Sequence, residues 1–78
     1  MNHLTLKLDQ KIKKVIISKT NSATDIAKMV ESAFKLKEKL IGVTDEDGKF
    51  YDLDFFSDNM RLLSSHTLNL VLASDANE

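Results

Sequence analysis

The chain has 78 residues, enough for one small domain, and its charged side chains leave a net charge of only −1. It contains no cysteine, which excludes a disulfide framework and any metal site built from thiolates. Its apolar runs are a few residues long, which excludes a membrane-spanning helix, and no targeting segment is visible, so we expect an intracellular protein.

The charge is unevenly distributed along the chain. Residues 1–39 hold nine lysines and four acidic residues, a net charge of +5, whereas residues 40–78 hold two basic and eight acidic residues, a net charge of −6. Such a separation says little about the fold, but it favours association between surfaces of opposite sign.

The first elements in chain order form a predicted hairpin. Apolar and polar residues alternate strictly in HLTLKL (3–8), which predicts a half-buried strand. After DQK, which can turn the chain, the β-branched run IKKVIIS (12–18) predicts a second strand with Val15 and Ile17 pointing inward.

A helix is predicted next, over about residues 22–37. Ser22 is a good N-cap, and Asp25 three residues later resembles a capping box and suits the positive end of the helix dipole. Apolar residues then recur at helical spacing, which gives the helix one apolar face. These residues are Ile26, Met29, Val30, Ala33, Phe34 and Leu36.

The C-terminal half predicts three further strands, LIGV (40–43), FYDLDFF (50–56) and HTLNLVLAS (66–74). SDNMRLLSS, between the last two, is expected to form a loop or a short helical turn. Because no proline or repeat marks a boundary, we expect one domain over residues 1–74 and a flexible tail over 75–78.

An acidic turn, DEDG (45–48), connects two of these strands. Asp47 and Gly48 suit a two-residue hairpin turn with positive φ at both positions. Glu46 is then expected to face Lys49 across the turn.

The five aromatic residues are interpreted as packing residues rather than as a binding surface. We expect Phe34, Phe50 and Phe55 in the core and one of Tyr51 or Phe56 at the surface. The lysine-rich half lacks the interleaved exposed aromatic residues and arginines that nucleic-acid-binding surfaces use, which argues against a nucleic-acid partner.

Catalytic, metal and nucleotide sites are not indicated. His3 and His66 are isolated, there is no Gly-x-Ser-x-Gly elbow or phosphate loop, and two glycines are too few for a dinucleotide fingerprint. A calcium loop beginning at Asp45 fails, because its later ligand and glycine positions hold Lys49, Phe50 and Phe56. We therefore expect no enzyme activity, no cofactor and no metal.

The expected order of elements is strand, strand, helix and then three strands. FFSDNMRLLSSHTLNLVL (55–72) resembles the end of ubiquitin, where a Ser-Asp loop precedes a Ser-Thr-Leu-x-Leu-Val-Leu strand. The order of elements is similar to ubiquitin along nearly the whole chain. The resemblance implies an α+β fold of the ubiquitin-like β-grasp type, a four- to five-stranded mixed sheet with one amphipathic helix packed across one face.

The charged segments also resemble those of Phox/Bem-type domains, another β-grasp group. Those domains join head to tail when a basic surface on one copy meets an acidic turn on another. DEDGKFYDLD (45–54) is similar to that turn, except that Lys49 replaces an acid. The resemblance implies binding residues Asp45, Asp47, Asp52 and Asp54 on the acidic side and Lys7, Lys13 and Lys14 on the basic side.

A third resemblance uses only the basic half. Ras-association domains add their second strand to the sheet edge of a small GTPase, whose acidic switch meets basic residues on the strand and the helix. The lysines similar to that arrangement are Lys11, Lys13, Lys14 and Lys19, with Lys28 on the helix. Lysine also protects exposed edge strands from aggregation.

Taken together, these features favour a non-catalytic interaction module, an adaptor or scaffold domain. We expect it to dock an acidic protein partner through its second strand and helix. Head-to-tail self-association and small-GTPase binding are the alternatives.

Overall fold

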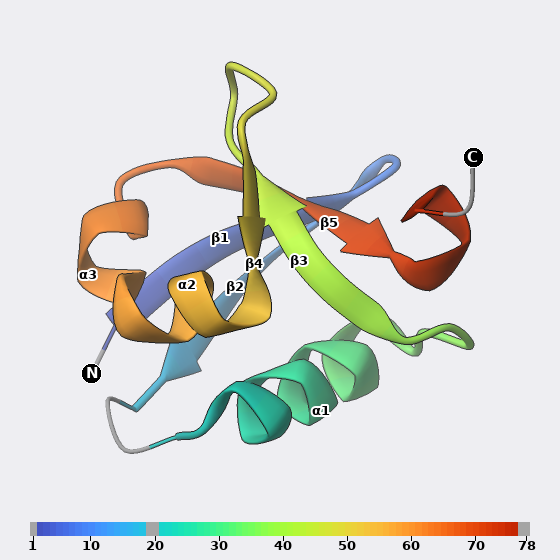
Figure 1. Ribbon diagram of the computed structural model, residues 1–78, viewed down its shortest axis with the longest axis horizontal. Coiled ribbons are helices and arrows are strands. Elements are labelled where there is room, and N and C mark those ends of the chain that lie inside the picture. The colour runs from blue at the N-terminus through green and yellow to red at the C-terminus, as the bar shows by residue number, and fades with distance from the viewer. Residues whose placement is uncertain (1, 19–20, 77–78) are drawn as a thin grey trace.

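The protein is an α+β domain built on one five-stranded mixed sheet with helices packed on it (Figure 1). The computed structural model describes residues 2–18 and 21–76. Its elements are β1 (Asn2–Leu8), β2 (Lys11–Ile17), α1 (Ala23–Phe34), β3 (Leu40–Thr44), β4 (Phe50–Asp52), α2 (Leu53–Asp58), α3 (Met60–Leu63), β5 (Thr67–Leu72) and the 3₁₀ helix η1 (Ala73–Ala76). The α+β class and the mixed sheet are as predicted, whereas α2, α3 and η1 are additional to the one helix that was expected. No helix in this described part is both long and apolar enough to cross a membrane.

The first and last strands lie side by side in the middle of the sheet. The strand order is β2-β1-β5-β3-β4, with β1 and β5 parallel and the other neighbouring strands antiparallel. The N-terminal hairpin and the β3–β4 hairpin therefore form opposite sides of the sheet, and β2 and β4 are its two edges. This topology separates the basic first half of the chain from the acidic second half.

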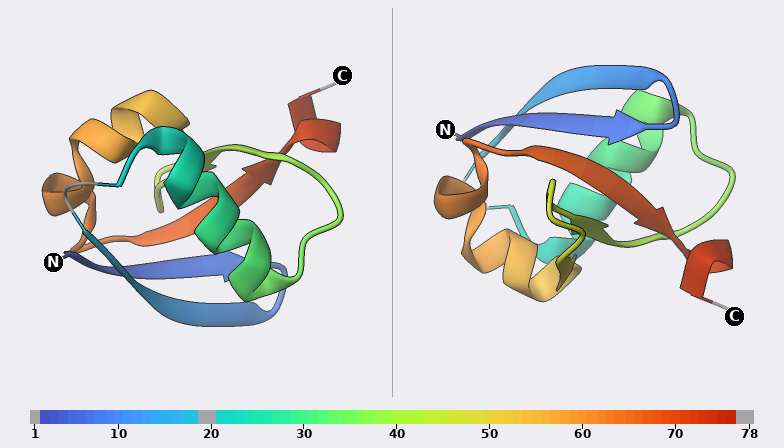
Figure 2. Two further views of the ribbon diagram at one scale, coloured as in Figure 1. Left: turned by 90° about the horizontal axis from the view of Figure 1, so that it is seen from below. Right: turned by 90° about the horizontal axis from the view of Figure 1, so that it is seen from above.

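The helix α1 crosses one face of the sheet and covers the main core (Figure 2). Leu4 and Leu6 of β1 are fully buried, which confirms the strand predicted from their alternation with polar residues. The apolar face of α1 packs against them, as its spacing predicted. Other buried members of this core are Ile17, Ile26, Val30, Phe34, Leu40, Val43, Leu68 and Leu70.

The ends of α1 follow from its capping residues. Ser22 is the N-cap, and its side-chain oxygen accepts a hydrogen bond of 3.2 Å from the backbone N–H of Asp25, as predicted. The helix ends at Phe34, earlier than the expected residue 37, because Lys35 adopts a left-handed conformation with φ of 53°. That conformation turns the following backbone N–H groups onto the last helical turn and ends the helix.

The segment after β4 differs from the predicted strand over 50–56. Only Phe50–Asp52 is a strand, and α2 begins directly after it, with the side chain of Asp52 accepting a 2.8 Å hydrogen bond from the N–H of Phe55. The apolar residues that face the core follow helical spacing through α2 and α3. They are Leu53, Phe56, Met60 and Leu63.

This helix changes which aromatic residues are buried. Phe34 is in the core as predicted, but the predictions for Phe50 and Phe55 are wrong, since these side chains are 49% and 42% exposed. Phe56 is fully buried instead, and Tyr51 is partly buried. An alternating strand would have placed Phe55 inward, whereas a helix starting at residue 53 turns Phe56 inward.

The C-terminal boundary is only partly described. Residues 75 and 76, expected to begin a flexible tail, belong to η1, and residues 77 and 78 lie outside the described residues. The backbone N–H of Ala73 binds the carbonyl of Lys39 at 2.9 Å, which attaches the start of η1 to the segment before β3.

Candidate functional site

The strand β2 is an edge of the sheet and carries three of the predicted lysines. Its register with β1 pairs Lys13 with Leu6 and Lys14 with Thr5. Leu6 is fully buried under α1, so Lys13 lies on the helix-covered face and Lys14 on the opposite face. The neighbouring lysines therefore do not form the single basic element that the resemblances implied.

The side chain of Lys13 is occupied within the domain. Its Nζ donates a 2.6 Å hydrogen bond to the carbonyl of Ala33, in the last turn of α1, and lies 5.7 Å from the centre of the Phe34 ring. A cation is favourable there, because the last carbonyls of a helix have no intrahelical donor and carry partial negative charge. Lys13 therefore serves the end of α1.

The outward face of the N-terminal hairpin combines lysine with exposed isoleucine. Lys7 of β1 pairs with Ile12 of β2, and Ile16 follows on the same face as Lys14. Ile12 and Ile16 are 60% and 50% exposed. We call Lys7, Ile12, Lys14 and Ile16, together with the exposed Lys11, which starts β2 on its other face, the β2 edge surface. The two isoleucines were not predicted as part of a binding surface. The inward placement of Val15 and Ile17 already implied that Ile12 and Ile16 point outward.

The remaining predicted lysines do not join this surface. Lys28 is exposed on α1 and borders a shallow groove shared with Leu53 and Asp54 of α2, on the side away from β2. The basic helix face expected from the Ras-association resemblance is therefore not next to the basic strand. Lys19 lies outside the described residues.

The acidic turn is a three-residue loop, not the predicted two-residue turn. Asp45 and Lys49 are joined by a backbone hydrogen bond of 3.0 Å, and the N–H of Gly48 binds the carbonyl of Asp45 at 3.0 Å. Gly48 has φ of 83°, but Asp47 does not have positive φ. This is a type I turn followed by a left-handed glycine, in which only Gly48 needs the conformational freedom of glycine.

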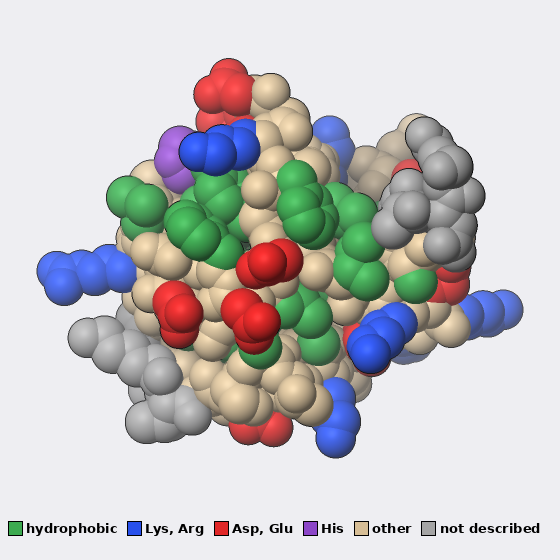
Figure 3. Space-filling view, in the orientation of Figure 1, with side chains coloured by type: hydrophobic (Ala, Val, Ile, Leu, Met, Phe, Trp, Pro, Cys, Tyr) green, Lys and Arg blue, Asp and Glu red, His purple; other side chains and the backbone are tan. Residues whose placement is uncertain are grey.

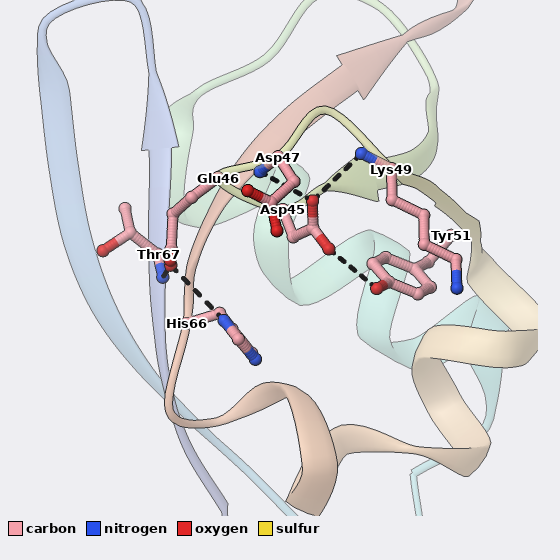
Figure 4. A network of polar contacts seen from close by, with 7 residues as sticks. All are labelled: Asp45, Glu46, Asp47, Lys49, Tyr51, His66 and Thr67. Carbon is pink, nitrogen blue, oxygen red and sulfur yellow. Dashed lines mark hydrogen bonds and ion pairs between the residues drawn. The ribbon is translucent and has the colours of Figure 1, made fainter.

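Asp45 holds this loop together and is not available to a partner. It is 9% exposed, and its Oδ1 accepts hydrogen bonds of 2.9 Å from the N–H groups of Asp47 and Lys49. Its Oδ2 accepts a 2.8 Å hydrogen bond from the hydroxyl of Tyr51 (Figure 4). The structure therefore gives Asp45 a role within the loop and does not support the docking role predicted for it.

A second contact fastens the loop to the start of β5. Glu46 does not face Lys49. Instead, its Oε1 accepts a 2.7 Å hydrogen bond from the backbone N–H of Thr67 and lies 3.5 Å from Nδ1 of His66 (Figure 4). The ion pair with His66 exists only when the imidazole is protonated. His66 therefore belongs to a structural contact.

The hydrogen bonds around Asp45 change two pKa values in opposite directions. The backbone N–H of Lys49, followed by the Tyr51 hydroxyl, lowers the pKa of Asp45 below its usual 3.8. The same carboxylate raises the pKa of Tyr51 above its usual 10.0, because the phenol donates to it only when protonated.

These shifts predict how stability depends on pH. The Asp45 contribution is fully present above the unfolded pKa of about 3.9 and is lost as the pH falls through the lower folded value. We expect the melting temperature of wild type to exceed that of Asp45→Asn near neutral pH, and this difference to shrink below about pH 4. The Tyr51 contribution is present below about pH 10, so the advantage of wild type over Tyr51→Phe should shrink above that pH.

Thermal melts followed by circular dichroism across this pH range measure both differences. Other carboxylates titrate equally in wild type and Asp45→Asn, so their contributions cancel. A difference between these two proteins that stays constant from neutral to strongly acidic pH would contradict the role of Asp45.

The other predicted acids are exposed. Asp47 lies at the tip of the loop, Asp52 caps α2 with one carboxylate oxygen, and Asp54 lies on the first turn of α2. Asp58, one turn further along α2, is exposed as well, although it was not among the predicted binding residues. None of these four carboxylates forms an ion pair with another described residue.

The described ranges, 2–18 and 21–76, contain no group of three metal-ligating side chains that could hold a metal ion. Comparison of the chain with protein-family models, with curated proteins and with solved structures found no match.

Proposed function

We propose that this chain is a ubiquitin-like β-grasp domain that works by binding proteins inside the cell and catalyses no reaction. The proposal is supported by the hairpin β1–β2, the helix α1 across one face, and a last strand that returns parallel to β1. The lack of cysteine is in keeping with an intracellular setting.

The partner that we propose is an acidic extended segment that pairs with β2. The observation that carries this is the free edge: β2 has β1 as its one neighbour in the described sheet and is seven residues long. An added strand would gain main-chain hydrogen bonds and would cover Ile12 and Ile16. Lys11 and Lys14, which form no ion pair with another described residue, would then attract acidic side chains of the partner.

A peptide of alternating glutamate and valine is a suitable probe of this edge. Binding can be followed through backbone amide chemical shifts, which we expect to change most along β2. Lys11→Glu/Lys14→Glu should weaken binding by about tenfold or more at low salt, because the charge of this edge changes from attractive to repulsive for glutamate. Lys13 is left unchanged, since it serves the end of α1.

The matched control is Lys28→Glu/Lys37→Glu, which changes the net charge equally at exposed positions outside β2. Equal losses of affinity in the two double variants would show that only net charge matters and would remove the β2 edge from the proposal. A GTP-loaded small GTPase, titrated against the same variants, tests the more specific partner suggested by the Ras-association resemblance.

Head-to-tail self-association is the second candidate. One observation favours it, namely that β2 and the acidic segment of β4 and α2 lie at opposite edges of one sheet. Sedimentation of the wild type and of Lys11→Glu/Lys14→Glu at low salt tests it. A wild type that stays monomeric at high concentration rules the contact out.

A further inference from the structure

A second exposed surface lies at the opposite edge of the sheet from β2. It combines two aromatic residues of β4, Phe50 and Tyr51, with Phe55 of α2, and it carries three acidic side chains. We call these residues the β4–α2 surface: Phe50, Tyr51, Asp52, Asp54, Phe55 and Asp58. Figure 3 shows acidic side chains standing among hydrophobic ones on this side of the molecule.

The aromatic part of this surface is ordered but not buried. The rings of Tyr51 and Phe55 stack with their centres 5.2 Å apart, and Phe50 lies over Gly42 on the other side of β4. Phe50 and Phe55 nevertheless keep almost half of their surface exposed. Rigid, partly exposed aromatic residues lose little conformational freedom on binding and are frequent energetic centres of interfaces.

The stability of α2 explains only part of this acidic character: Asp52 caps the helix and Asp54 in its first turn suits the positive end of the helix dipole, whereas Asp58 has no such role. Asp54 and Asp58 are four residues apart on α2, so they repel each other on one helix face. Asp58 is the last residue of α2, where a negative charge is unfavourable. Phe56, between them in the chain, faces the core, so both carboxylates point outward with Phe55.

A lysine of the same chain already contacts the aromatic part of this surface. Nζ of Lys49 lies 5.6 Å from the centre of the Tyr51 ring. The hydroxyl of Tyr51 donates to the Asp45 carboxylate, which leaves the ring more electron-rich and more attractive to a cation. The surface thus offers both an aromatic face and free carboxylates to positive groups.

From this geometry we propose that the β4–α2 surface binds a segment of another protein in which two or more lysine or arginine residues accompany apolar side chains. The apolar side chains cover Phe50 and Phe55, while the cations meet Asp52, Asp54 and Asp58. This binding is independent of the β2 edge surface, because the two surfaces lie at opposite edges of the sheet.

A second copy of this chain is a poorer occupant. Of the lysines on β2, Lys13 is bonded to Ala33, and Lys11 and Lys14 lie on opposite faces of the strand. They cannot approach three carboxylates on one side of the domain together. Lys28 and Lys39 border a groove beside Asp54, but neither forms an ion pair with it.

The test uses a short peptide of alternating lysine and leucine, with a glutamate–leucine peptide of the same length as the charge-reversed probe. The chain has one tyrosine and no tryptophan, so the fluorescence of Tyr51 reports binding at this surface directly. We expect saturable binding of the basic peptide, with amide shifts over residues 50–58, and no binding of the acidic peptide at this surface.

Two variants should change the affinity in opposite directions. Lys49→Met removes a competing cation and a repulsive charge, and should tighten binding by about two- to fivefold. Asp54→Asn/Asp58→Asn should weaken it by about three- to tenfold at low salt. The stability of α2 should change little, because the lost dipole interaction of Asp54 and the removed like-charge pair act in opposite directions. The matched control, Asp9→Asn/Asp25→Asn, removes two exposed acids elsewhere and should leave the affinity within about twofold.

Three outcomes would overturn the proposal. The first is equal weakening by Asp54→Asn/Asp58→Asn and by the control. The second is a set of amide shifts centred on β2 or α1. The third is self-association in sedimentation that Asp54→Asn/Asp58→Asn abolishes, which would assign the surface to a second copy.

Discussion

Phe56→Ala is expected to destabilise the domain by about 3–5 kcal/mol, the usual cost of removing a phenylalanine from a packed core. Phe56 is fully buried and belongs to the main core. Because a domain of this size has only about 5–15 kcal/mol of stability, the variant should be close to unfolding. Chemical denaturation followed by circular dichroism measures the loss.

The neighbouring residue is the matched control. Phe55→Ala removes an equally large ring from a side chain that is 42% exposed, together with its stacking on Tyr51. We expect a loss of about 1 kcal/mol or less. Equal losses at the two positions would contradict the helical placement of this segment, since an alternating strand would have buried Phe55.

Gly42→Ala is expected to cost about 2–3 kcal/mol through overpacking. A Cβ on Gly42 would collide with the carbonyl oxygen of Tyr51 and would lie 2.7 Å from two carbons of the Phe50 ring. Gly42 pairs with Asp52 across β3 and β4, so relief requires β4 to move away from β3. The melting temperature should fall by roughly 10–20 °C.

Gly48→Ala separates this steric effect from the general effect of losing a glycine. Gly48 has φ of 83° with open space around it, so its substitution should cost only the left-handed backbone, about 1–2 kcal/mol. Adding Phe50→Ala to Gly42→Ala should recover part of the stability, because one of the two collisions disappears. A smaller loss at Gly42 than at Gly48 would be inconsistent with the close packing of β4.

The β2 edge surface and the β4–α2 surface would allow the proposed adaptor domain to bind two partners. One edge of the sheet carries lysine and isoleucine, and the other carries aspartate and aromatic residues. Partners of opposite charge could occupy the two edges at the same time, since the width of the sheet separates them. Gly42 is important to the second surface, because its missing side chain leaves room for the Phe50 ring.

Local sequence pattern is sufficient for much of this fold. The alternation in residues 3–8 and the helical spacing after Ser22 predict elements that the structure contains, because burial of one face dictates the period of apolar residues. The same rule could have found α2 and α3 through Leu53, Phe56, Met60 and Leu63. The prediction failed there because phenylalanine and tyrosine at residues 50–56 also suit a strand. Periodicity over so few residues does not distinguish a helix from a strand.

The charged sites depend on tertiary structure. The sequence shows lysines in the predicted second strand and acidic residues around residue 45. The register of β2 with β1 then shows that Lys13 and Lys14 lie on opposite faces. Only the approach of Tyr51 and of the loop N–H groups makes Asp45 a buried acceptor. The sequence identifies the charged residues but does not show which face of the domain each side chain occupies. Binding depends on that face and on whether the side chain is already hydrogen-bonded within the domain.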